Sequence, residues 1–162
     1  APPDHSEGTP SCTLLTAVVT RDEITVGWIG DSRAYWLSRA PGGTSRRLTR
    51  DDTVVARLTA QGVDHATAAG RRDANALERW VGADAAQGPP NLLSLRPDGP
   101  GWLVLCSDGL WNYLPDAGAM AAATGGRDTP MGVAGELTDF ALRQGGGDNV
   151  TVVVVRVPLV PG

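Results

Sequence analysis

Three apolar runs rich in β-branched residues constrain this chain most, because each has an aspartate and a glycine at one end. The run 24–29 precedes Asp31, the run 102–107 precedes Asp108, and the run 150–157 follows Asp148. Runs of this length and composition are typical of buried β-strands. A carboxylate at the end of such a strand, beside flexible glycine backbone, is suited to bind a hard cation through oxygen. The sequence therefore predicts a metal site built from the ends of separate strands.

Composition excludes several classes of function. The net charge is −4, so the chain has no excess of basic residues to bind phosphate groups, and we expect no nucleic-acid partner. No apolar stretch approaches the roughly 18 residues of a membrane-spanning helix, so we expect no membrane segment. The sequence opens on Ala1, so any targeting segment upstream lies outside these residues. Cys12 and Cys106 lie in apolar runs without a nearby histidine, which predicts two buried free thiols in a reducing cytoplasm rather than a zinc site.

Periodicity predicts one α+β domain over residues 1–162. Strands are expected at 11–19, 23–29, 33–37, 46–49, 91–95, 102–106 and 150–157. Helices are expected from Asp51 or Asp52 as N-cap to Gln61, in one or two turns at 74–80, at 116–123, and from Thr129 as N-cap to Gly145. Strands dominate early and a helical pair precedes the last strand, which is typical of α+β architecture rather than of regular βαβ alternation.

The glycine-rich segment 145–147 raises the alternative of a nucleotide site. A phosphate-binding loop continues into Gly-Lys-Ser/Thr and opens a helix, whereas this segment leads into a strand and the chain contains no lysine. We therefore interpret these glycines as the end of the preceding helix and as backbone that can fold tightly against a bound ion.

Residues 30–34, Gly-Asp-Ser-Arg-Ala, raise the alternative of a serine hydrolase because they differ at one position from the Gly-x-Ser-x-Gly elbow. That elbow turns from a strand into a helix, but here a strand follows. A catalytic triad would also need a histidine, and His5 and His65 both lie in polar segments. Each aspartate alone could be a turn former. Three together favour a metal site, and carboxylates without a local histidine or thiolate select Mg²⁺ or Mn²⁺ over zinc.

Four short motifs occur in a fixed order along the chain: GDSRAY at 30–35, LTRDD at 48–52, LCSDGLW at 105–111 and GDNVT at 147–151, with a less specific segment at 76–82. They resemble successive motifs of the metal-dependent serine/threonine phosphatases of the protein phosphatase 2C family. The likeness runs from about residue 11 to residue 157. It implies part of an α–β–β–α sandwich with two antiparallel sheets, and hydrolysis of phosphoserine and phosphothreonine with two Mg²⁺ or Mn²⁺ ions.

The resemblance also implies roles for individual residues. Asp108 and Asp148 would be ligands of one catalytic ion, and Asp31 would belong to a third, weaker metal position of bacterial-type members. Asn149 would orient Asp148, and Gly109 would shape the loop beside it. No residue of this chain beyond the metal ligands is expected to be catalytic.

The chain departs from the family near its start. The family's metal-bridging aspartate lies in an Asp-Gly-x-Gly-Gly motif, preceded by another acidic ligand and by the arginine that binds phosphate, and none of these is present. Arg33 is therefore read as structural. We expect an incomplete catalytic domain, from a truncated or divided parent chain, that lacks the N-terminal strands and helices and is weak or inactive alone. The alternative is a non-catalytic phosphatase-like scaffold that binds a protein partner or a single ion.

The resemblance implies partners as well. We expect phosphorylated serine/threonine proteins as substrates and a counterpart serine/threonine kinase in a signalling pathway. Missing strands would leave sheet edges and apolar core uncovered, so the isolated chain should aggregate.

Overall fold

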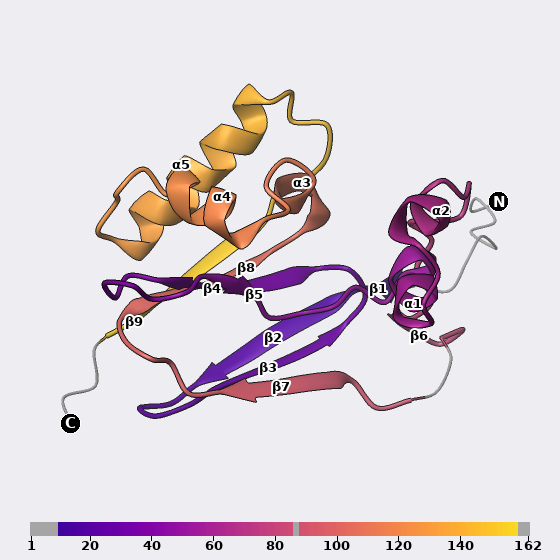
Figure 1. Ribbon diagram of the computed structural model, residues 1–162, viewed down its shortest axis with the longest axis horizontal. Helices are drawn as coiled ribbons and strands as arrows, with labels where there is room; N and C mark the ends of the chain where they lie inside the picture. The colour runs from indigo at the N-terminus through magenta and orange to yellow at the C-terminus, as the bar shows by residue number, and fades with distance from the viewer. Residues whose placement is uncertain (1–9, 86–87, 159–162) are drawn as a thin grey trace, which may run out of the picture.

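The computed structural model describes residues 10–85 and 88–158, which form helices and antiparallel sheets (Figure 1). The strands are β1 (Ser11–Cys12), β2 (Leu14–Val19), β3 (Ile24–Ile29), β4 (Arg33–Ser38), β5 (Arg46–Arg47), β6 (Val81–Gly82), β7 (Asn91–Leu95), β8 (Gly101–Cys106) and β9 (Val152–Val157). The helices are α1 (Val54–Ala60), α2 (His65–Ala69), α3 (Asp108–Trp111), α4 (Ala117–Ala123) and α5 (Pro130–Arg143). The predicted α+β class with antiparallel sheets is confirmed.

Two of the three sheets form the body of the molecule. The larger sheet has the strand order β5-β4-β8-β9, and the second has the order β2-β3-β7. The short strands β1 and β6 pair separately, so the strand expected over 11–19 is interrupted at Thr13. The interruption has a physical cause, because the two halves of this segment pair with different strands.

The larger sheet is covered on both faces. One face carries α3, α4 and α5, and the other packs on the second sheet (Figure 1). The helix α5 begins after Thr129, its predicted N-cap, and Val133, Leu137 and Ala141 are fully buried at successive turns, while Phe140 is partly buried against the same core. The core between the two sheets contains Ile24, Val26, Trp28, Ala34, Trp36, Leu48, Leu95, Leu103, Leu105 and Val157.

The outer face of the second sheet is different. Leu14, Val18 and Leu92 point outward and are 50%, 62% and 69% exposed, respectively. Of the helices described at 10–85 and 88–158, none covers this face (Figure 1). Exposed apolar side chains on a sheet face favour association, and aggregation of the isolated chain stays a prediction.

The helix over 54–60 begins later than expected. Thr53 is its N-cap and accepts a hydrogen bond from the Ala56 amide at 3.4 Å, so the predicted caps Asp51 and Asp52 were wrong. Both aspartates are instead bound by partners from other strands and loops. The partial helix expected at 74–80 is a series of turns with one bridge between Thr53 and Leu77. The short helix α2, capped by Asp64, was not predicted.

The two cysteines differ in their surroundings. Cys106 is buried in the larger sheet as predicted, and burial raises the pKa of its thiol to about 12. Cys12 is exposed, which corrects the expectation of a buried side chain, because its two-residue strand pairs only with β6 within residues 10–85 and 88–158. Both thiols are free. Among the helices of the described ranges, none combines the length and the apolar character needed to cross a membrane.

Candidate metal centre

Strand pairing brings the three predicted aspartates to one end of the larger sheet. In the register of the sheet, Cys106 at the end of β8 lies opposite Arg33 at the start of β4 and Val152 at the start of β9. Asp31 and Asp148 come shortly before β4 and β9, and Asp108 comes shortly after β8. Because these strands are antiparallel, residues that are far apart in sequence meet at the same end.

The turn that carries Asp31 is fixed on both sides. Gly30 has a φ of +110°, which only glycine adopts readily, and its N–H donates to the Asp52 carboxylate at 2.9 Å. The Asp52 N–H returns a bond of 2.9 Å to the Gly30 carbonyl. On the other side, the Trp111 indole N–H donates to the Asp31 carbonyl at 3.0 Å. These bonds fix the backbone of the Asp31 turn beside α3.

The electrostatics at Asp31 combine partial burial with neighbouring negative charge, and the positive charge of Arg33 acts against them as the smallest of the causes. Partial burial is the largest cause that raises the pKa of Asp31, and the negative charge of Asp108 is the second. Two neighbouring carboxylates of this kind are stabilised when a cation binds between or beside them. The donor set of oxygens, without histidine or thiolate, suits Mg²⁺ or Mn²⁺.

The segments around Asp108 and Asp148 pack directly against each other. The Ser107 hydroxyl donates to the Asn149 carbonyl at 3.1 Å and accepts the Thr151 N–H at 3.0 Å. A Cβ added at Gly109 would lie 2.4 Å from the Asn149 carbonyl oxygen, so only glycine allows this approach. The two motifs thus form one unit that sets the distance between their aspartates.

The loop that carries Asp148 is held in place through the three glycines that precede this aspartate. Gly145 and Gly146 have φ values of +124° and +54°, and the Gly147 N–H donates to the Tyr113 hydroxyl at 3.1 Å. The Asp148 carboxylate accepts the Asn149 N–H at 2.7 Å and is exposed to solvent. Asn149 therefore contacts Asp148 through its backbone amide.

The described residues do not contain a finished metal cage. No three histidine, cysteine, aspartate or glutamate side chains within 10–85 and 88–158 are close enough to hold an ion together. Asp31 and Asp108 are electrostatic neighbours, whereas Asp148 lies on the adjoining loop. The roles of Asp31, Asp108, Asp148, Asn149 and Gly109 in metal binding stay predictions.

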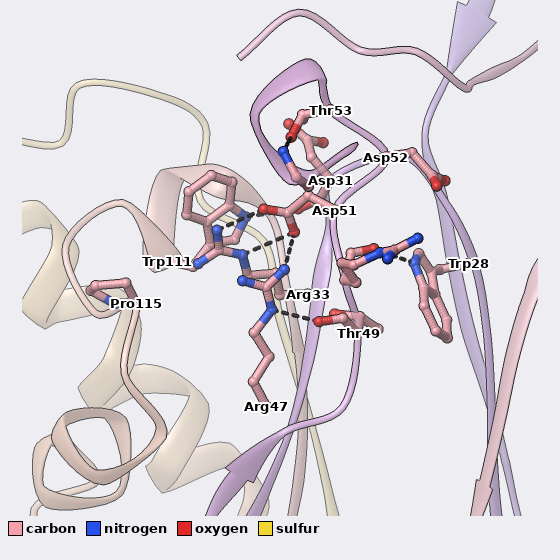
Figure 2. Close-up of polar contacts among 12 residues, drawn as sticks. Trp28, Asp31, Arg33, Arg47, Thr49, Asp51, Asp52, Thr53, Trp111 and Pro115 are labelled. Carbon is pink, nitrogen blue, oxygen red and sulfur yellow. Dashed lines mark hydrogen bonds and ion pairs between the residues drawn. The ribbon is translucent and has the colours of Figure 1, made fainter. Parts of the chain in front are cut away.

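A second charged cluster lies beside this end of the sheet and was not predicted as a cluster. Figure 2 shows Asp51 between the guanidinium groups of Arg33 and Arg47. Arg33 donates to the two Asp51 oxygens at 3.1 and 2.7 Å, and Arg47 donates at 2.5 Å. The Arg33 guanidinium also lies over the Trp111 ring, 3.5 Å from its centroid. Arg33 is buried and pairs with both oxygens of Asp51, which agrees with the structural role predicted for it.

Asp52 points away from this cluster and joins three segments (Figure 2). Besides Gly30, it accepts the Asn91 amide at 3.0 Å on both oxygens and lies 3.5 Å from Arg79. The sequence signal for both aspartates was the LTRDD motif itself, but their cap-like position before a helix suggested a local role instead. Their partners are distant in sequence, so local pattern could not reveal them.

Comparison with known proteins agrees with this geometry. The sequence model of protein phosphatase 2C matches residues 92–150, which include Asp108 and Asp148. A crystal structure of the Mycobacterium tuberculosis serine/threonine phosphatase PstP/Ppp is similar over 90% of this chain, with a TM-score of 0.75 and 29% identity. In sequence and in fold the chain is similar to phosphatases of the protein phosphatase 2C family.

Further relatives show how much of a related protein the chain spans. The serine/threonine phosphatase stp of Listeria innocua is 29% identical over 145 residues, which are 89% of this chain and 56% of that protein. A rice protein kinase and PP2C-like domain-containing protein is 31% identical over 90% of this chain and 24% of its own length. The chain thus spans about half of the bacterial relative. A PstP catalytic domain solved in complex with two manganese ions is 29% identical, with a TM-score of 0.70.

Proposed function

We propose that residues 11–157 are part of the catalytic domain of a metal-dependent phosphatase that acts on phosphoserine and phosphothreonine in proteins. The observation that carries this proposal is the meeting of three family motifs, each with its aspartate, at one end of the larger sheet. The proposal is supported by the names of the relatives, which are serine/threonine phosphatases. It is also supported by the two manganese ions in the PstP complex.

In this proposal Asp108 and Asp148 hold one Mg²⁺ or Mn²⁺ ion, and Asp31 is an accessory ligand. When bound, such ions lower the pKa of a water molecule that attacks phosphorus and neutralise the charge that develops on the phosphate. The residues of this chain hold the ligands in place. Ser107 ties the Asp108 loop to the Asp148 loop, and Trp111 fixes the backbone of Asp31. No side chain of this chain is proposed as a nucleophile.

The proposed partners follow from the reaction. The substrates are phosphorylated proteins, and a serine/threonine kinase must supply the phosphate that this enzyme removes. We also propose a cytoplasmic location, for which the support is the pair of free thiols, because reducing compartments keep cysteines unpaired. Fractionation of cells with an antibody against the chain tests the location.

The activity is tested by Mn²⁺-dependent release of phosphate from a phosphothreonine peptide. We expect little or no turnover from the 162-residue polypeptide, because the Asp-Gly-x-Gly-Gly motif is absent from it. A version extended upstream to the initiator methionine should turn over if that extension supplies the motif, and Asp108→Asn should then lower kcat by about 10²-fold or more.

Three results decide between the alternatives. Robust turnover by the short polypeptide would show that the motif is dispensable. An extended chain without the motif and without turnover would favour the non-catalytic scaffold. Activity that survives both chelation and Asp108→Asn would contradict the proposed metal site.

A further inference from the structure

A cavity of about 470 Å³ lies beside the Asp51 cluster, between α1 and the segment 47–51. Arg47, Arg50 and Asp51 line its polar side. Val55, Ala56 and Ala60 of α1 give it an apolar wall. The cavity therefore has charged groups on one side and an apolar wall on the other, which is the usual character of a ligand pocket.

The charges that line the cavity are not balanced. Three guanidinium groups, of Arg33, Arg47 and Arg50, and one carboxylate, of Asp51, line the cavity, so positive side chains outnumber negative ones there. Arg33 and Arg47 already occupy both Asp51 oxygens. The pKa of Arg47 is lowered chiefly by burial, so this guanidinium has lost part of its hydration. A bound anion would replace that hydration and compensate the remaining charge.

We propose that this cavity binds an acidic side chain of a peptide ligand, either a carboxylate or a phosphate, with its carbon chain against α1. A smaller cavity, lined by Asp31, Arg33 and Trp111, adjoins it and shares Arg33 and Asp51 with it. The acidic residue of the ligand therefore binds beside the end of the larger sheet at which Asp31 and Asp108 lie. The inference rests on the proposed function only in identifying the ligand as a phosphoprotein substrate with an acidic residue near its phosphorylated one.

The two neighbouring sites respond oppositely to an anion. Without metal, the carboxylates of Asp31 and Asp108 repel it, whereas the arginines of the cavity attract it. Binding of an acidic peptide in the presence of EDTA therefore reports on the cavity alone. A failure of metal binding at Asp108 would leave that measurement unchanged, so the two proposals fail separately.

The test uses three fluorescein-labelled peptides that differ at one central residue: glutamate, phosphoserine or alanine. Fluorescence anisotropy is measured with the 162-residue chain in EDTA at low ionic strength. We expect the glutamate and phosphoserine peptides to bind about tenfold more tightly than the alanine peptide. Amide shifts in ¹⁵N NMR spectra should concentrate on 47–51 and on α1. Inorganic phosphate should compete only weakly, because it makes no contact with the apolar wall.

Two variants and one control locate the site. Arg47→Gln should weaken acidic-peptide binding by about tenfold and Arg50→Gln by about threefold, because Arg50 is exposed. Arg50→Gln removes no hydrogen bond recorded among the described residues, so it tests the proposal even if Arg47→Gln unfolds. Arg46→Gln, an exposed neighbour outside the cavity, should change binding by less than about 1.5-fold. Equal binding of the alanine peptide, equal effects of Arg46→Gln and Arg50→Gln, or full competition by inorganic phosphate would overturn the inference.

Discussion

Asp51 lies at the same end of the larger sheet as a second group of aspartates, which consists of Asp31, Asp108 and Asp148. The two groups differ in what surrounds them. Asp51 is buried, and both of its oxygens are bound by arginines. Asp31 and Asp108 have each other as neighbours, and the recorded bonds of Asp108 and Asp148 are to the adjacent backbone amides. Two arginines of the chain neutralise Asp51, whereas the pKa of Asp31 is raised because burial and the charge of Asp108 outweigh the charge of Arg33.

The comparison predicts opposite effects on stability. The largest is at Asp51, where Asp51→Ala would leave the buried Arg33 guanidinium without its partner. We expect a loss of about 3–5 kcal/mol in the free energy of unfolding, the usual cost of breaking a buried pair on one side. Urea denaturation followed by circular dichroism measures it. A loss below about 1 kcal/mol would mean that the cluster contributes no more than an exposed ion pair.

The contact between the two family motifs gives the next largest effect. Gly109→Ala places a methyl group against the Asn149 carbonyl, where a Cβ would come within 2.4 Å of the oxygen. We expect a loss of about 1–3 kcal/mol from the forced backbone movement. Gly135→Ala on α5 is the matched control, because a Cβ there meets nothing within 4 Å. The control should be neutral or slightly stabilising, and equal effects of the two changes would contradict the close approach.

Trp111 connects the two aspartate groups, and a conservative change separates its two contacts. Trp111→Phe keeps an aromatic ring near Arg33 but removes the indole N–H that binds the Asp31 carbonyl. We expect a loss of about 1 kcal/mol, the typical value of one hydrogen bond. NMR shifts should move at residues 30–32 and remain unchanged at 47–51. Shifts that appear only at 47–51 would show that Trp111 stabilises the fold through its contact with Arg33 and not through the hydrogen bond to Asp31.

The smallest expected effect has the opposite sign. Asp31→Asn removes one of two neighbouring negative charges, so in EDTA it should raise stability by about 0.5 kcal/mol, or about 1–2 °C in Tm. The increase should vanish when Mn²⁺ is present, because the ion then neutralises the wild-type site. A clear loss of stability in EDTA would show that Asp31 has a structural role like that of Asp51.

The sequence was sufficient for features that depend on local pattern. Apolar runs predicted the strands, and the Thr129 N-cap predicted where α5 begins. The register of the sheet then explains why Asp31, Asp108 and Asp148 share one end. Features that depend on distant partners were missed.

Asp51 illustrates the reason for the misses. Its chemical type and its position before α1 are those of an N-cap, but Thr53 forms the cap and Arg33, eighteen residues earlier, binds Asp51 instead. Cys12 was misjudged for a related reason, because an apolar run does not reveal that its short strand pairs with the short strand β6, apart from the main sheets of the described part of the chain. In both cases tertiary pairing overrode local preference.

The central claim is that Asp108 and Asp148 jointly bind one divalent cation. Mn²⁺ binding to the 162-residue chain, measured by electron paramagnetic resonance of the free ion, tests it most directly. We predict one ion per chain, with affinity lowered at least about tenfold by Asp108→Asn and by Asp148→Asn, and unchanged by Asp139→Asn on the exposed face of α5. Binding that is absent in the wild type, or equal in all three variants, would contradict the account.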